Sequence, residues 1–204
     1  MSLRGAAGTL CVVLALACYR APTVDVGPIP AGVSVDASLR YYDISAASLG
    51  EINRAIARLG PRDHGRAWGA TTTWRLSWTY QTARVGGGEW CEARRTLVRV
   101  RTEVTFPRWT PTSEPDSALL VWWQQFSAGL AEHERGHAIL AVQAAGALAK
   151  EIDGQQALCG QLGSQVISVA QKRILSVTQE QEMYDFTTRH GATQIRAARQ
   201  LQEP

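Results

Sequence analysis

The sequence predicts an α+β fold in which a small antiparallel sheet packs against two long helices. Residues 33–106 contain three segments where apolar and polar side chains alternate, which is the pattern of strands with one buried face. From about residue 116 onward, apolar residues recur at helical spacing over two long stretches. Strands followed by helices along the chain are typical of a sheet that carries its helices on one side.

The first predicted elements are a strand and a short helix. In the strand, five apolar residues alternate with polar ones: Val33, Val35, Ala37, Leu39 and Tyr41. Ser45 is placed to cap a helix over about 46–59, because a serine side chain can accept a hydrogen bond from the first helical turn. Gly60 and Pro61 end that helix, since proline cannot continue it.

An antiparallel hairpin is predicted over residues 72–106. Large apolar residues alternate with polar ones in both of its strands: Trp74, Leu76, Trp78 and Tyr80 in one, Val98, Val100, Val104 and Phe106 in the other. The glycines at 86–88 supply a flexible turn between them. Three prolines then close the β half of the chain: Pro107, Pro111 and Pro115.

Two long helices follow. The first covers about 116–152 and ends at Asp153-Gly154, with Gly129 as a candidate break. The second, the long C-terminal helix, covers about 162–188, and Gly191 is its stop signal by residue type. The helical pattern resumes over 193–201.

Residues 1–21 have the form of a signal peptide. Arg4 precedes an apolar run over 9–17 that is too short to span a bilayer permanently, and residues 15–17 read Ala-Leu-Ala, a cleavage site for export. Cys18 follows directly and is a candidate for lipidation, although the leucine expected three residues before it is replaced by alanine. Soluble and lipid-anchored forms both stay open. Residues 22–32 are rich in proline and glycine and predict a linker, so 33–204 forms a single domain.

The charge balance predicts no special partner. The chain has 21 Lys+Arg against 18 Asp+Glu, and loss of Arg4 with residues 1–17 lowers the net charge from +3 to +2. Arg99 and Arg101 alternate with apolar residues, as on the wet face of a strand. A nucleic-acid surface would add stacking aromatics and a larger positive excess, so no nucleic-acid partner is expected.

Cys91 and Cys159 are the only cysteines after Cys18. Two cysteines in an oxidising compartment most simply form a disulfide, which would tie the β half to the start of the last helix. Neither has a CxxC partner, which argues against the alternative of a thiolate zinc ligand.

Residues 133–137 read His-Glu-Arg-Gly-His, an HExxH motif. On a helix His133 and His137 lie on one face and can bind one zinc ion, while Glu134 is placed to act as general base on a water bound to it. Gly136 leaves room for another element to approach the helix. The alternative is an exposed helix face, but two of the chain's four histidines lie in this one string.

A catalytic zinc usually takes a third protein ligand. Gln143 occupies the position where one class of HExxH enzymes has a histidine, and Glu151 lies about 20 Å along the same helix from His137. The segment 184–191 is therefore the predicted source: His190 is the preferred ligand, and Asp185 is the alternative ligand or a support for a bound histidine. Tyr184 is a candidate hydrogen-bond donor to the reaction's oxyanion, with a role in the core as the alternative.

The two motifs together, HExGH and YDxxTxHG some fifty residues later, resemble a family of bacterial secreted proteins that is catalogued as a domain of unknown function and described as zinc-dependent proteases. The first motif matches His133, Glu134, Gly136 and His137, and the second matches Tyr184, Asp185, Thr188, His190 and Gly191. The resemblance covers most of the chain beyond residue 33.

This resemblance and the motif chemistry lead to one functional hypothesis with an alternative. The domain is predicted to be zincin-like, binding one Zn²⁺ and hydrolysing a peptide or protein substrate through a zinc-bound water activated by Glu134. The protein is expected to be exported, and to be periplasmic, secreted or anchored to the bacterial envelope through Cys18. The alternative is an exported metal-binding or envelope-interaction module that cleaves nothing.

Overall fold

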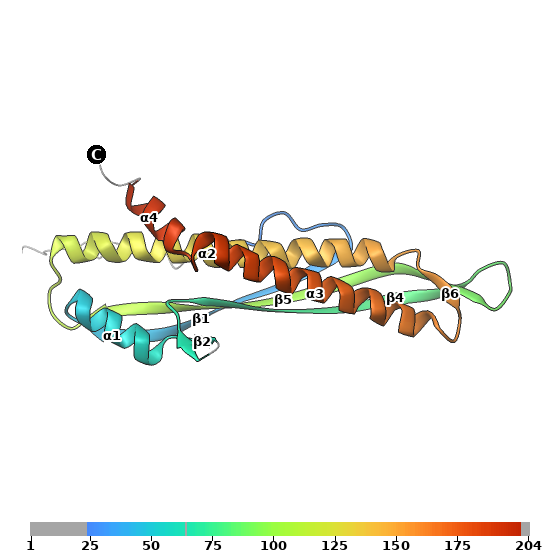
Figure 1. Ribbon diagram of the computed structural model, residues 1–204, viewed down its shortest axis with the longest axis horizontal. Coiled ribbons are helices and arrows are strands. Elements are labelled where there is room, and N and C mark those ends of the chain that lie inside the picture. Colours follow the sequence, from blue (N-terminus) through green and yellow to red (C-terminus); the bar gives the residue numbers. More distant parts are fainter. Residues whose placement is uncertain (1–23, 64, 201–204) are drawn as a thin grey trace, which may run out of the picture.

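The computed structural model describes residues 24–63 and 65–200, and side chains as far as Arg196; the predicted signal peptide and Cys18 lie outside the described residues. Its elements are, in chain order, β1 (Val33–Ala46), α1 (Leu49–Leu59), β2 (Arg62–Asp63), β3 (Arg66–Ala67), β4 (Thr71–Arg84), β5 (Trp90–Pro111), α2 (Ser117–Ile152), β6 (Gln156–Leu158), α3 (Leu162–Thr188) and α4 (Ala192–Gln200). Figure 1 shows an elongated molecule in which α2 and α3 run along the long strands. The α+β prediction, with a long helix near the C-terminus, is confirmed.

The sheet is mixed rather than purely antiparallel. Its order is β1-β5-β4, with the short β6 added to β5, and the β4–β5 hairpin is antiparallel as predicted. β1, however, pairs with β5 in parallel, from Val33↔Val98 to Ala46↔Pro111. The alternation of apolar residues reports which side chains share a face but not the direction of the neighbouring strand. The predicted antiparallel arrangement is therefore wrong for β1.

Two predicted boundaries are also wrong. β5 continues through Pro107 to Pro111, because β4 begins at Thr71 opposite Thr105 and leaves that end of β5 paired only with β1. Proline has no backbone N–H to donate, so it is tolerated in a strand where one edge pairs with no other strand. α1 is capped by Ser48, whose side chain accepts from the amide of Glu51, and not by Ser45, which lies inside β1.

α2 runs without a break past Gly129. A Cβ at Gly129 would lie 2.4 Å from the Cα of Ile195, so the missing side chain admits the backbone of α4. Gly146 likewise makes room for the segment before β1, since a Cβ at Gly146 would lie 2.7 Å from the ring of Pro30. Residues 24–32 form neither helix nor strand, yet they pack along α2, and Asp25 pairs with Arg135 at 2.8 Å.

The largest core cluster joins the inner face of the sheet to α2 and α3. Its fully buried members include Val98, Val100, Leu148, Ile152 and Val166. The predicted disulfide between Cys91 and Cys159 is present and connects β5 to the segment just before α3. Among the described residues, no helix is long and apolar enough to cross a membrane.

Candidate metal centre

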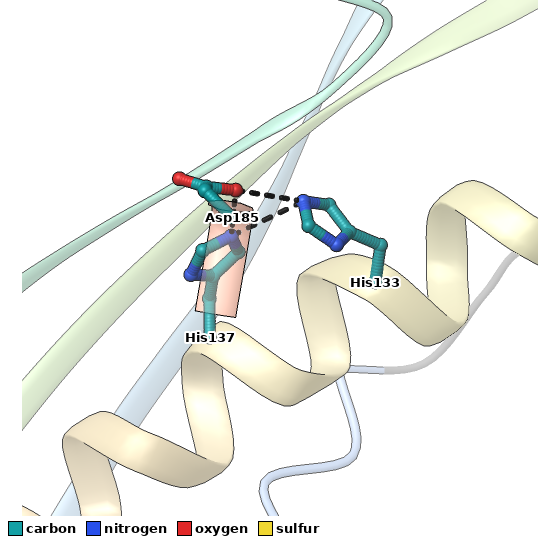
Figure 2. A group of neighbouring side chains, drawn as sticks. All are labelled: His133, His137 and Asp185. Carbon is teal, nitrogen blue, oxygen red and sulfur yellow. Dashed lines mark hydrogen bonds and ion pairs between the residues drawn. The ribbon is translucent and has the colours of Figure 1, made fainter. Parts of the chain in front are cut away.

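Three side chains from α2 and α3 converge between the helices. His133 and His137 project from successive turns of α2 toward the carboxylate of Asp185 on α3, as Figure 2 shows. Asp185 Oδ1 lies 3.1 Å from the Nε2 atom of each histidine, and the two Nε2 atoms are 3.2 Å apart. Both histidines are buried. The structure thus contains a buried group whose geometry allows it to bind a metal ion.

The outer ring nitrogens of both histidines are anchored to α3. Nδ1 of His137 donates a short hydrogen bond to Gln181 Oε1, and Gln181 Nε2 donates to the carbonyl of His137 at 3.0 Å. Nδ1 of His133 lies 3.4 Å from the hydroxyl of Thr188, which itself donates to the Tyr184 carbonyl at 2.7 Å. Bonds of this kind hold a histidine in the tautomer that presents Nε2 to a metal.

The converging atoms require a positive charge among them. With both Nδ1 atoms protonated, two Nε2 lone pairs and a carboxylate oxygen face one point, and three acceptors repel one another unless a cation lies between them. The directions of the pKa shifts in Asp185 and His137 are consistent with a positive charge among these atoms. Burial alone would raise the pKa of Asp185, but the two histidines outweigh it and hold that pKa below its usual value. Burial alone would lower the pKa of His137, yet Asp185 and Gln181 raise it.

The donor set fits zinc. Two imidazole nitrogens and a carboxylate oxygen are typical zinc ligands, and at bond lengths of about 2.0–2.2 Å tetrahedral ligands lie about 3.3 Å apart. The three separations of 3.1, 3.1 and 3.2 Å are close to that spacing.

Glu134 lies beside this group and is itself buried. Its Oε2 atom accepts from the hydroxyl of Thr72 at 2.7 Å, and the same hydroxyl lies 3.2 Å from the Glu134 carbonyl oxygen. Burial raises the pKa of Glu134, while Thr72 and the two histidines partly oppose that rise. A carboxylate with a raised pKa is a stronger base for removing a proton.

A cavity of about 290 Å³ opens onto these side chains. Its walls come from α2, from α3 and the turn after it, from the β2–β3 hairpin and from the start of β4: Arg62, Asp63, Trp68, Gly69, Ala70, Thr71, Thr72, Thr73, Trp74, Leu130, His133, Glu134, His137, Gln181, Asp185 and His190. β4 is an edge strand of the main sheet. The start of this edge strand therefore forms one wall of the cavity beside the candidate metal centre.

His190, the preferred third ligand in the sequence analysis, lies next to the centre but outside the group whose ligand atoms lie within 4.8 Å of one another. Its Nδ1 atom is 3.5 Å from Asp185 Oδ1, and its ring stacks on Trp68 with 4.3 Å between centroids. The alternative ligand, Asp185, is the one that joins His133 and His137. Whether His190 binds metal stays a prediction.

Tyr184 packs on the centre from the α3 side. Its ring stacks on His133 with 5.2 Å between centroids, and its hydroxyl accepts from Gln194 at 3.1 Å. A Cβ at Gly136 would lie 2.1 Å from that hydroxyl oxygen, so the glycine of the motif makes room for Tyr184. Tyr184 is not among the cavity-lining side chains, and this position does not favour its predicted role as oxyanion donor.

Some partners of the site were missed at the level of sequence. Gln181 stands four residues before Asp185 and seven before Thr188, both of which belong to the second motif, so the shared face of α3 was a usable signal for Gln181. Thr72 and Trp68 reach the site from the β half, and nothing in their local sequence marks them.

Two histidines on one helix and a carboxylate from a second helix thus form a buried group that could hold a metal ion, with a buried glutamate beside it. Residues 39–191 match a family model described as "Bacterial protein of unknown function (DUF922)", and the chain belongs to this family. The match covers both sequence motifs. The family description assigns no activity, and no curated protein and no solved structure matches the chain.

Proposed function

We propose that the protein is an exported zinc-dependent metallopeptidase. The observation that carries the proposal is the convergence of His133, His137 and Asp185 beside the buried carboxylate of Glu134, on the wall of an open cavity. A purely structural metal site has no use for a buried base at this position. His133, His137 and Asp185 would hold the ion.

The protein's own groups support a hydrolytic mechanism. Bound zinc would supply a Lewis acid that polarises a carbonyl and lowers the pKa of water. Glu134 takes a proton from the attacking water and later delivers it to the nitrogen of the leaving amine. Thr72 orients the carboxylate by donating to Oε2 at 2.7 Å. Gln181 and Thr188 keep the two imidazoles in place through their Nδ1 atoms.

The edge strand beside the cavity favours a peptide as substrate. Residues 71–74 of β4 line the cavity, and in the described part of the chain β4 pairs with β5 on one side only. An extended peptide can add to such an edge through backbone hydrogen bonds. A peptide bound this way would pass directly over Glu134 and the two histidines.

The second candidate is an exported metal-binding module without activity. Structural zinc sites are generally closed by four protein ligands, whereas this group has three and faces a cavity. That difference favours the enzyme.

Export of either form is part of the proposal, and the Cys91–Cys159 disulfide suits an oxidising compartment. Labelling with radioactive palmitate in wild type and Cys18→Ser tests the lipid anchor.

The central test combines metal content with cleavage. Full-length protein exported in a bacterial host is assayed for zinc by mass spectrometry and for hydrolysis of fluorescent casein. Wild type should carry one zinc and cleave, and Glu134→Gln should keep zinc while losing about 10²–10⁴-fold in rate. Glu132→Gln, an exposed acid on the same helix, is the matched control. A wild type without zinc, or a Glu134→Gln variant that cleaves normally, contradicts the proposal.

A further inference from the structure

His190 differs from the other two histidines of the centre in how its ring is held. His133 and His137 use Nδ1 to bond α3 and direct Nε2 at Asp185. His190 is held by stacking on Trp68, with its Nδ1 atom 3.5 Å from Asp185 Oδ1. Among the hydrogen bonds of the described residues, none involves a ring nitrogen of His190. Apart from the 3.5 Å approach of Nδ1 to Asp185 Oδ1, the ring nitrogens of His190 are therefore available to another partner.

The backbone around His190 is fixed in an uncommon conformation. Arg189, His190 and Gly191 have φ angles of 52°, 51° and 83°, all in the left-handed region. The amide of His190 donates to the carbonyl of Asp185 at 2.8 Å. A Cβ at Gly191 would lie 3.1 Å from Cγ of His133, so this turn packs directly on the centre. Non-glycine residues held in this region cluster at functional sites.

The imidazole of His190 is also half-exposed and lines the cavity, with 47% of its side chain accessible. Two other polar groups of the wall are already engaged. The Thr72 hydroxyl donates to Glu134, and Arg62 donates to the carbonyl of Gly65 at 3.2 Å. His190 is thus a pre-positioned donor at the open side of the centre.

We propose that His190 donates a ring N–H to the carbonyl oxygen of the scissile peptide as negative charge develops on that oxygen. The inference rests on the proposed peptidase function. Water oxygen bonds to the carbonyl carbon, the π electron pair moves to the carbonyl oxygen, and the water proton passes to Glu134. When the C–N bond breaks, that pair re-forms the carbonyl and Glu134 protonates the amine. His190 keeps its proton throughout, and its hydrogen bond is strongest at the oxyanion.

This assignment separates His190 from the ligand role that the sequence analysis gave it. If His190 were a third ligand, its replacement would remove the metal. As an oxyanion donor, its loss leaves the metal bound and lowers kcat with little change in KM, because the bond acts mainly in the transition state. The matched control is Arg189→Ala, in the same left-handed turn but outside the cavity wall.

The experiment measures zinc per chain by mass spectrometry, and kcat and KM on a fluorogenic peptide copied from the first casein site that wild type cuts. His190→Ala should keep one zinc and lose about 10²–10³-fold in kcat, with KM within about threefold of wild type. His190→Gln, which retains an N–H donor, should recover part of the loss, and Arg189→Ala should match wild type.

Loss of zinc from His190→Ala would make His190 a ligand and overturn the inference. Unchanged kcat, or a raised KM alone, would overturn it as well, while leaving the peptidase proposal standing. A zinc-loaded wild type that cuts neither casein nor any peptide in a mixed library would contradict the proposed function. The inference about His190 would then fail as well, because it rests on that function.

Discussion

The two ends of α3 are attached to the rest of the molecule by different means. At the N-terminal end, Leu162, Val166 and Ala170 are at most 2% exposed in an apolar core, and the Cys91–Cys159 bond lies directly before the helix. At the C-terminal end, the helix meets α2 through the polar side chains of Gln181 and Asp185.

This difference separates stability from function within one helix. Apolar burial depends little on orientation and needs no ligand, so the disulfide end can hold α3 in place by itself. Hydrogen bonds and a carboxylate among imidazoles demand defined geometry and a cation. The end of α3 that carries Gln181 and Asp185 is therefore the part of the helix whose order should depend on the proposed zinc ion.

Removing the disulfide should have the largest effect, and it should act on stability alone. The bridge joins residues 68 apart in the sequence, which corresponds to about 4 kcal/mol of unfolding free energy. The double variant Cys91→Ala/Cys159→Ala is compared with wild type by urea unfolding, and zinc is measured on the folded protein. A variant that stays folded but loses its zinc would mean that the two ends are not independent.

Asp185→Asn should lower zinc affinity and leave the fold intact, which is the opposite of the effect expected for removal of the disulfide. It replaces the carboxylate by an amide of the same shape, so zinc affinity should fall by more than the roughly 10–100-fold that loss of a supporting partner costs. Zinc competition with a chromogenic chelator gives the affinity, and circular dichroism should report an intact fold. Glu182→Gln, an exposed acid on the same helix, should bind zinc normally. Equal affinity in Asp185→Asn and wild type would remove Asp185 from the site.

Gln181→Leu tests the bond that orients His137. The leucine keeps the buried volume but leaves Nδ1 and the carbonyl of His137 without their partner. Zinc affinity should fall about 10–100-fold, with a smaller effect on unfolding of the zinc-free protein. The same chelator competition measures it. If only stability falls, Gln181 serves the packing of the helices and not the metal.

Gly136→Ala should have the smallest effect. The new methyl group would meet Tyr184, which stacks on His133, so about 1–3 kcal/mol of strain is partly offset by about 1 kcal/mol of helix propensity. Gly163→Ala is the matched change at the disulfide end, where the nearest atom is 4.0 Å from the new Cβ, and it should be neutral or stabilising. Thermal unfolding of both variants with and without EDTA compares them.

Much of this organisation could be predicted from local patterns. The two long helices follow from apolar spacing, and α3 begins and ends at the predicted residues. The pairing of Cys91 with Cys159 was predicted because they are the only cysteines downstream of Cys18. The direction of β1 and the continuation of β5 through Pro107 could not be predicted, because both depend on which strand lies beside β1.

Local sequence patterns place His133 and His137 on one helix face with Glu134 next to them, and they single out the segment 184–191 as the source of a partner. Helical periodicity settles such relations within an element. Long-range packing settles that Asp185 meets the two imidazoles while His190 stacks on Trp68. That outcome depends on the crossing of α2 and α3, on the room that Gly136 leaves for Tyr184 and on the left-handed turn at Arg189. Each of these is a contact between residues far apart in the chain, which no local pattern encodes.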